Sequence, residues 1–371
     1  MKYDVAIIGG GLAGLALAND LAMRGRKVVV FEKGNYPRHK VCGEYISMES
    51  HSYLLKLCPV FNSMKLPVIK EFLLTTTGGS EFKTELDLGG FGISRYVLEN
   101  LLYTKALEAG VNVVVNSKVS AVVRSGVEQG LIKTATGDFN ATLICNSTGR
   151  KSNFEVKSVD RQQAGINYVG VKYHVKTERD SAQIGIHNFP GGYCGISEIE
   201  DGKSCLCYIV NSKKLLQAGN SISEMEKKFL FKNKNLEKIF QSAEFVFETP
   251  VTISGINFKI KKSADDGIFY LGDSAGSISP VTGNGMSMAL RSANFLAGEF
   301  DNYFQNTISV TELTERYRNF WRNQFESRIK FSRYLQKFSE YPFLTKGVIA
   351  LFKTVPSLAA KVIRLTHGKP F

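Results

Sequence analysis

The apolar positions near the start of the chain predict a β-α-β unit. Tyr3 to Ile8 form a short apolar run, and a helical pattern follows with its apolar residues on one face. Gly25 ends that pattern, and Lys27 to Phe31 form a second strand rich in β-branched residues. Two strands joined by a helix within about 30 residues are typical of a parallel α/β sheet.

The middle of the chain has a different period. Residues 68–75 and 81–86 alternate between apolar and polar positions on either side of a Gly-Gly turn, which predicts a hairpin. A helix is expected over residues 221–240. Four further strands, separated by turns rich in Gly, Asp and Pro, are predicted over 168–175, 182–187, 192–199 and 203–210. This part of the chain therefore favours a mostly antiparallel sheet.

The last 60 residues alternate as amphipathic helices do. A first pattern runs over Thr311 to Tyr341, and its predicted apolar positions are Tyr317, Trp321, Phe325, Phe331, Leu335 and Phe338. A second pattern begins after Pro342 and continues to Gly368, interrupted at Pro356. These helices either cover the rest of the fold or contact a membrane surface.

Charge is concentrated in the same region. The chain has 371 residues, 43% of them apolar and 22% charged, which excludes an intrinsically disordered protein. From Arg316 to the end there are twelve basic and two acidic residues, so +10 of the net +13 lies there. A nucleic-acid-binding protein more often spreads its basic residues over its recognition elements, so no nucleic-acid partner is expected. The basic end instead predicts contact with a membrane surface or an anionic partner.

Targeting and redox signals are weak. Lys2 and the uncharged run from Val5 to Asn19 imitate a signal peptide, but Asp4 argues against export. No run reaches the ~20 apolar residues of a membrane span, so the expected location is the cytoplasm, with peripheral contact at the inner face of the membrane as an option. Six cysteines without metal spacing predict reduced thiols and no metal.

The first candidate chemistry lies between the two N-terminal strands. Gly9, Gly11 and Gly14 form G-x-G-x-x-G after the first strand, and Glu32 follows the second. These glycines permit a tight turn, close approach of a pyrophosphate to the helix N-terminus, and close packing of helix on sheet. Glu32 can accept hydrogen bonds from an adenosine ribose. The pattern predicts a dinucleotide site.

A distant second motif resembles one found in flavoprotein monooxygenases and geranylgeranyl reductases. Gly272-Asp273 follows a short apolar strand, and the loop from Gly283 to Met286 opens a helix. The resemblance implies FAD, with Asp273 holding its ribityl chain and the glycine loop under the flavin pyrimidine. Backbone N–H groups at a helix N-terminus stabilise negative charge on a reduced flavin.

Three more segments resemble the same superfamily. Arg95, on the helix from residue 95, takes the place of an arginine near the FAD pyrophosphate, and the backbone near Val119 takes that of the adenine contact. Residues 37–44 resemble the P-R-x-K-x-C-G-E segment of the reductase branch, which implies that Arg38 faces the FAD phosphates or ribose and that Cys42 lies near the isoalloxazine ring. Thr148 stands where aromatic hydroxylases have Asp, and this departure argues against direct NADPH use but not against FAD.

The resemblance implies an α/β fold, with an FAD-binding Rossmann-like domain of the glutathione-reductase type, an inserted mostly antiparallel β substrate domain and a helical C-terminus. The predicted ranges are 1–66, 92–158 and 250–310 for the FAD domain, 67–91 and 159–249 for the substrate domain, and 311–371 for the basic helical region. Cys42 is the candidate catalytic residue. The predicted cofactor-binding residues are Gly9, Gly11, Leu12, Ala13, Gly14, Glu32, Lys33, Arg38, Arg95, Val119, Asp273, Gly283, Asn284, Gly285 and Met286.

The implied activity is that of an FAD-dependent oxidoreductase. The first hypothesis is a monooxygenase that hydroxylates an aromatic or polyketide-like lipophilic compound of secondary metabolism, free or carrier-bound. The alternatives are a geranylgeranyl-reductase-like enzyme acting on carbon–carbon double bonds, and a non-catalytic FAD-binding protein that docks at membranes. Only one G-x-G-x-x-G is present, so NAD(P)H is expected as a transient electron donor at the flavin, with a partner reductase as the other source. His174 and His187, on predicted strands, are further acid–base candidates.

Overall fold

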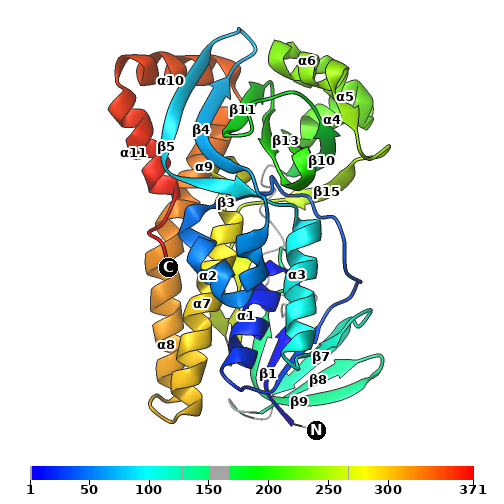
Figure 1. Cartoon of the computed structure of the whole chain (residues 1–371), viewed down its shortest axis with the longest axis vertical. Helices are drawn as coiled ribbons and strands as arrows, with labels where there is room; N and C mark the ends of the chain where they lie inside the picture. The colour runs from blue at the N-terminus through cyan, green and yellow to red at the C-terminus, as the bar shows by residue number, and fades with distance from the viewer. Residues whose placement is uncertain (1, 125, 127–128, 151–166, 266) are drawn as a thin grey trace.

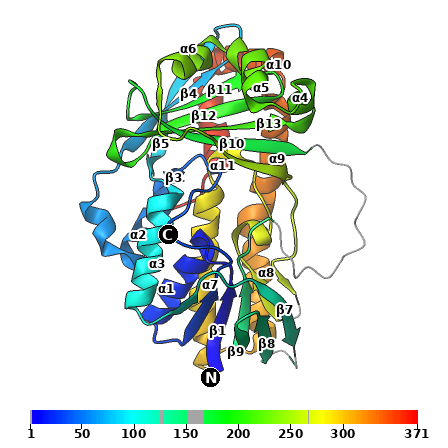
Figure 2. The same cartoon turned by 90° about the vertical axis from the view of Figure 1, so that its right-hand side faces the viewer.

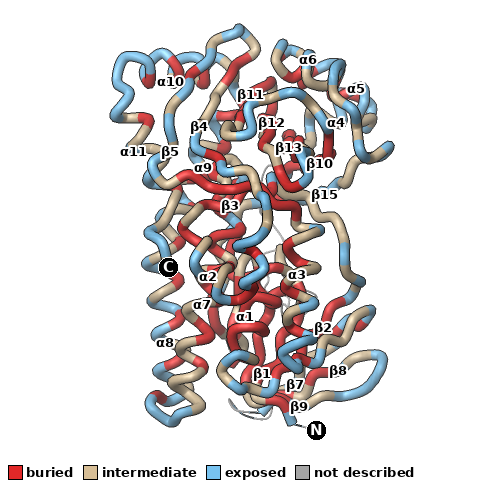
Figure 3. Tube along the Cα trace, in the orientation of Figure 1, coloured by how far each residue is buried: buried red, intermediate tan, exposed pale blue. Residues whose placement is uncertain are grey.

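Two sheets form the body of the molecule and lie one above the other along its long axis (Figure 1). The computed structural model describes residues 2–124, 126, 129–150, 167–265 and 267–371. Buried positions gather along α1 (Leu12–Met23) and α7 (Gly285–Phe304), and around β3 (Tyr45–Ser47) where the two sheets meet (Figure 3). The middle of the molecule, where the two sheets meet, is therefore buried.

The first sheet contains the predicted β-α-β unit. β1 (Lys2–Ile8) pairs in parallel with β2 (Val28–Phe31) on one side and with β9 (Gly137–Asn146) on the other. Every residue of β2 is buried, as expected of a parallel strand covered on both faces. The other strands of this sheet are β6 (Asn112–Val114), β7 (Val119–Arg124), β8 (Gly130–Thr134), β16 (Ala264–Asp265) and β17 (Ile268–Tyr270). Together with α3 (Arg95–Glu108), α1 and α7 give the α/β architecture expected from the sequence.

The second sheet is mostly antiparallel, and its strand order is β14-β10-β13-β12-β11-β4-β5-β3 with β15 beside β10. The predicted hairpin and the four predicted strands are all present in it. Helices α4 (Ser212–Gln217), α5 (Ile222–Lys228) and α6 (Lys234–Ser242) cover one face (Figure 2). The strands are β4 (Val68–Thr75), β5 (Glu81–Gly92), β10 (Tyr168–Lys176), β11 (Gln183–Phe189), β12 (Gly192–Glu198), β13 (Ser204–Asn211), β14 (Glu244–Phe245) and β15 (Val251–Ile256).

The single helix expected over residues 221–240 is wrong. The structure has α5 and α6 instead, with a short turn between them at Leu230–Lys232. Asn233 is the reason, because its side chain accepts the N–H of Asn235 at 3.1 Å and caps α6. Its amide also donates to Thr75 Oγ1 at 2.9 Å and to the carbonyl of Asn188 at 3.0 Å, so the sheet fixes the point where the new helix begins.

The C-terminal helices pack on both halves of the molecule. α8 (Val310–Trp321) lies along α7, whereas α10 (Pro342–Thr354) and α11 (Pro356–Thr366) contact β5 (Figure 1). Among the described residues, no helix is both long and apolar enough to cross a bilayer.

The predicted apolar face of the helix after Phe325 is wrong. Buried apolar residues recur every four positions as far as Ile329, which is slightly more than one α-helical turn. A π-helical turn over Arg322–Glu326 contains more residues per turn and so keeps these apolar residues on one side of the helix. α9 (Ser327–Ser339) then buries Ser332 and Gln336, while Phe338 is 46% exposed. Ser279 explains the inversion, because its N–H donates to Ser332 Oγ at 3.1 Å and its hydroxyl to Gln336 Oε1 at 2.6 Å.

Candidate functional site

The G-x-G-x-x-G loop joins β1 to α1 with its backbone open to a ligand. Gly9 has φ +105°, and a Cβ there would lie 2.5 Å from the carbonyl oxygen of Ser147. A Cβ on Gly14 would lie 2.2 Å from the carbonyl oxygen of Gly9. On Gly11 the nearest atom would be Lys40 Nζ, at 3.3 Å. No side chain caps α1 and its first turn has no acidic residue, so the N–H groups of Leu12 and Ala13 begin the helix without a side-chain acceptor.

Glu32 lies at the far side of this loop. Its carboxylate accepts the N–H groups of Gly10 and Gly34, each at 3.0 Å, and forms an ion pair with Arg38. Burial alone would raise the pKa of Glu32, but the hydrogen bond and charge of Arg38 outweigh it and lower that pKa. The N–H of Ser117 donates to the Glu32 carbonyl at 2.8 Å, which brings the start of β7, and so Val119, to the same end of the loop. Lys33, the next residue, is exposed.

Three cations gather above the start of α1. Arg95 Nε donates to Glu99 Oε1 at 2.8 Å, and Lys40 Nζ lies 3.0 Å from Glu99 Oε2. Arg38 Nε, 3.9 Å from the same carboxylate, is buried and has no hydrogen-bond partner within the described part of the chain. Burial lowers the pKa of Lys40 to about 8, and the charges of Arg95 and Arg38 act in the same direction. Lys40 and Glu99 were not among the predicted site residues.

The second motif meets the first at Gly272. A Cβ on this glycine would lie 3.6 Å from the Cβ of Ala13 in α1 and 3.4 Å from that of Ala289 in α7. Asp273 follows it, and its carboxylate pairs with Arg150 Nε at 3.2 Å. Segments that are 260 residues apart in the chain thus bring Asp273 to the start of α1.

The glycine loop at the start of α7 lies under Tyr45. Gly283 has φ +65°, and a Cβ there would touch the Tyr45 ring at 3.1 Å. Gly285 and Met286 open α7, whose first turn has no acidic residue. The side-chain amide of Asn284 donates to the carbonyl of Thr366, so among the described contacts Asn284 ties the C-terminus to this loop. The Oδ1 atom of the same amide is buried and has no hydrogen-bond partner among the described residues, so it and the backbone are the groups of Asn284 that a flavin could use.

These residues fit FAD. A pyrophosphate needs uncapped N–H groups, a backbone without side chains and nearby cations, and the start of α1 supplies all three. The buried, unpartnered Nε of Arg38 is a donor that such an anion would satisfy. Asp273 and the loop from Gly283 to Met286 would hold the ribityl and pyrimidine parts.

The glycine loop at the start of α1 and the three cations Arg38, Lys40 and Arg95 are here named the cradle. A buried ionic network connects this cradle to the second sheet. Glu44 Oε1 accepts from Lys172 Nζ at 2.6 Å and from the N–H of Arg95 at 2.8 Å, and Glu44 Oε2 lies 2.6 Å from His174 Nε2. Burial alone would raise the pKa of Glu44, but His174 and Lys172 together lower it. Glu44, His174 and Cys205 bring one possible metal-ligand atom each within 4.8 Å, yet the ammonium of Lys172 already provides the cation next to Glu44.

Cys42 begins the same turn. Its sulfur accepts the N–H of Glu44 at 3.5 Å, and its carbonyl accepts the thiol of Cys205 at 3.2 Å. Cys205 and Cys207 lie on the face of β13 that carries their strand neighbours His174 and Lys172. Burial raises the pKa of both thiols, that of Cys207 to about 12, so they stay protonated. The catalytic role of Cys42 stays a prediction.

An apolar wall continues this face of the second sheet. It is formed by Tyr168, Ile186, Tyr193, Ile209 and Ile256, and Val281 of the flavin loop packs against it. The hydroxyl of Tyr193 is buried and has no hydrogen-bond partner among the described residues. His187 lies on the opposite, helix-covered face, where its Nδ1 is 2.8 Å from Thr75 Oγ1. Burial lowers the pKa of His187 to about 4, so it is a neutral structural residue.

Comparison with known proteins agrees with the cradle. A family model described as FAD dependent oxidoreductase matches residues 4–41. The chain is an FAD-dependent oxidoreductase. The oxidoreductase is 26% identical over 86% of its length to the digeranylgeranylglycerophospholipid reductase of Methanosarcina acetivorans, covering 80% of that protein. It is 24% identical over 99% of its length to the conditioned medium factor receptor 1 of Dictyostelium discoideum, covering 77% of it.

Solved structures share the fold of the oxidoreductase. A triple mutant of the flavin-dependent brominase Bmp2 superposes with a TM-score of 0.80 at 19% identity, over 98% of this chain and 94% of that one. PqsL, a probable FAD-dependent monooxygenase from Pseudomonas aeruginosa, gives 0.73 at 16% identity, over 94% and 100%. At these identities the likeness establishes the fold.

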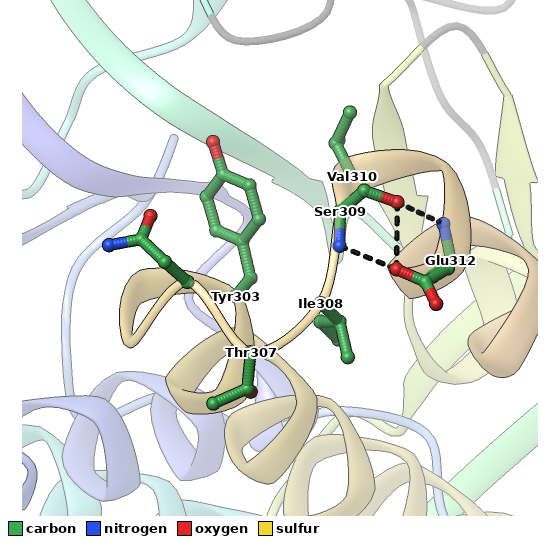
Figure 4. Close-up of a pocket in the computed structure, with 7 residues that line it drawn as sticks. Tyr303, Thr307, Ile308, Ser309, Val310 and Glu312 are labelled. Carbon is green, nitrogen blue, oxygen red and sulfur yellow. Dashed lines mark hydrogen bonds between the residues drawn. The ribbon is translucent and has the colours of Figure 1, made fainter.

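One cavity of the described structure lies elsewhere. It is an open hollow of about 510 Å³ at the turn between α7 and α8 (Figure 4). Ser309 and Glu312, which line it, use their side chains to cap α8 in a reciprocal pair of hydrogen bonds. The hollow lies at the end of α7, about 30 Å from the glycine loop, which excludes it as the flavin site.

Proposed function

We propose that this FAD-dependent oxidoreductase reduces carbon–carbon double bonds in a lipophilic, prenyl-type chain. The observation that carries the proposal is the wall facing the cradle, whose five residues are apolar except for two hydroxyls. That of Tyr168 donates to Glu340, and that of Tyr193 has no hydrogen-bond partner among the described residues. Such a surface suits a long apolar ligand with few polar anchors. The similarity to a digeranylgeranylglycerophospholipid reductase supports it, since that alignment runs through both sheets.

The residues present divide the work between them. When bound and reduced by NAD(P)H, FAD would supply the hydride that a double bond takes up, and a proton would complete the addition. Arg38, Lys40 and Arg95 would hold its pyrophosphate, and the wall would exclude water from the double bond. Burial raises the pKa of Tyr193 well above its ordinary value, so its hydroxyl keeps its proton and can donate a hydrogen bond at this wall.

One experiment separates reduction from hydroxylation. The holoenzyme is reduced with NADPH or NADH, the proposed transient donors, and mixed anaerobically with a digeranylgeranyl glycerophospholipid. Reduction predicts that the flavin reoxidises without oxygen and that mass spectrometry shows two hydrogens added per double bond. A flavin that stays reduced until labelled dioxygen is admitted, and a product that contains the label, would instead favour hydroxylation of an aromatic or polyketide-like compound. Tight FAD binding with no turnover under either condition would favour the non-catalytic alternative.

Replacing Tyr193 with phenylalanine tests the wall directly. Removing one positioned hydrogen-bond donor is expected to lower kcat by about a hundredfold while FAD content stays unchanged. Phenylalanine keeps the ring and leaves no buried hydroxyl unpaired, so the folded protein should be at least as stable. Steady-state kinetics and the flavin-to-protein absorbance ratio check both parts. An unchanged kcat would show that the hydroxyl takes no part in turnover.

A further inference from the structure

Helix α9 exposes aromatic side chains that the core does not use. Tyr334 and Phe338 are one helical turn apart on α9 and are 64% and 46% exposed, and Tyr341, just before α10, is 51% exposed. Phe343 begins α10 and is 70% exposed, with its ring 6.1 Å from that of Tyr341. These four residues, here named the aromatic corner, form an apolar surface where α9 meets α10.

The corner cannot turn inward without breaking buried polar contacts. The opposite side of α9 holds Ser332 and Gln336, which bind Ser279. Just beyond α9, the carboxylate of Glu340 is buried and accepts from Asn211 Nδ2 at 3.0 Å and from the hydroxyl of Tyr168. Both contacts fix the rotation of the helix, so the aromatic exposure is built into the fold.

Charge at the corner has one sign. Lys330, Lys337 and Lys346 are exposed around it, with Lys330 paired to Glu326 at its edge. Between residues 327 and 346 the sequence has a single acidic residue, Glu340, and that carboxylate points inward. Leu351, further along α10, is another exposed apolar residue, at 46%. The outward face therefore combines aromatic rings with lysines and has no carboxylate from its own helices.

We propose that the aromatic corner docks on the surface of an anionic lipid bilayer. Aromatic rings enter the headgroup region while flanking lysines bind anionic lipids, and such contact needs no fixed complementary pockets. Ser279, on the inner side of α9, begins the loop that leads to Gly283. Docking here would place the flavin loop one helix away from the lipid. This surface does not depend on the proposed function, although it would explain access to a lipophilic chain.

Sedimentation with vesicles tests the proposal on the full chain with FAD bound. Phosphatidylcholine vesicles are compared with vesicles that also contain phosphatidylglycerol. Binding is expected only with phosphatidylglycerol and is expected to weaken as salt rises, because the screening length falls from about 10 Å at 0.1 M to about 3 Å at 1 M. Replacing Phe338 and Phe343 together with serine should lower binding by about tenfold or more. Replacing Lys337 and Lys346 with glutamate should abolish the extra binding that phosphatidylglycerol gives over phosphatidylcholine alone.

Matched controls lie at the other end of the molecule. Leu107 on α3 is also 46% exposed, so Leu107→Ser removes a similar apolar surface. Lys133→Glu reverses an exposed charge on β8. Both controls should bind vesicles as the unmodified chain does. No binding to anionic vesicles, an equal loss in the controls, or capture of an acidic acyl carrier protein without vesicle binding would each overturn the proposal.

Discussion

Replacing Gly11 with valine is expected to abolish FAD retention while hardly changing the stability of the apoprotein. The new side chain would stand over the start of α1, where a pyrophosphate must approach the N–H groups. Losing two hydrogen bonds to a charged group costs about 3 kcal/mol or more, which is roughly a hundredfold in Kd. The fold should tolerate the change, since the nearest atom to a Cβ at Gly11 is the flexible end of Lys40. Flavin content after gel filtration measures the first effect, and urea unfolding of the apoprotein the second.

Two other glycines provide the controls. Gly14→Val would force a Cβ to within 2.2 Å of the Gly9 carbonyl, so it should destabilise the apoprotein by several kcal/mol, about as much as an overpacked core. Gly298 lies inside α7 with no atom within 4 Å of a Cβ, so Gly298→Ala should bind FAD normally and gain about 0.5–1 kcal/mol. Normal FAD content in Gly11→Val would show that the pyrophosphate lies elsewhere.

Local patterns in the sequence predicted local structure well. The strand from Tyr3, the glycine turn and the following helix form from residues that are neighbours in the chain, and the structure confirms them. The hairpin around Gly78 is also confirmed, although β5 runs on to Gly92. The C-terminal helices were predicted, but not which side of α9 faces inward. That side is decided by contacts with Ser279, which is distant in sequence, and the spacing of apolar residues along the helix does not reveal such contacts.

The polar network of the site could not be predicted for the same reason. Glu44 and Lys172 are 128 residues apart, and they meet because β10 crosses above the turn that follows Cys42. Lys40 lay inside the quoted P-R-x-K-x-C-G-E segment, so its motif position was the signal that could have identified it. Glu99 had a weaker signal, four residues after Arg95 on one helix, where an ion pair is expected.

Replacing Glu44 with glutamine is expected to cost about 3–5 kcal/mol of the free energy of unfolding. The neutral amide would leave the ammonium of Lys172 buried without a countercharge, and a buried ion pair with one partner removed loses this much. That is a large share of the 5–15 kcal/mol that typically stabilises a domain. Urea unfolding of the full chain at pH 7 measures the loss.

Two further variants separate burial from charge. On the same strand, β10, Lys176 pairs with Glu244, and both side chains are more than half exposed. Glu244→Gln should therefore cost about 1 kcal/mol or less. Adding Lys172→Met to Glu44→Gln should recover much of the loss, since the lone buried charge is then gone. A loss in Glu44→Gln no greater than in Glu244→Gln would contradict the buried network.

The same network gives stability a pH dependence of known sign. The folded pKa of Glu44 lies below its ordinary value of 4.5, because His174 and Lys172 outweigh the effect of burial. A carboxyl with a depressed folded pKa adds stability that is present above its unfolded pKa and is lost as pH falls through the folded one. Unfolding free energies measured from pH 7 downward should therefore fall more steeply below pH 4.5 in the unmodified chain than in Glu44→Gln. Parallel curves would mean that Glu44 does not fold as the carboxylate, and the ion pair with Lys172 would have to be replaced by a neutral hydrogen bond.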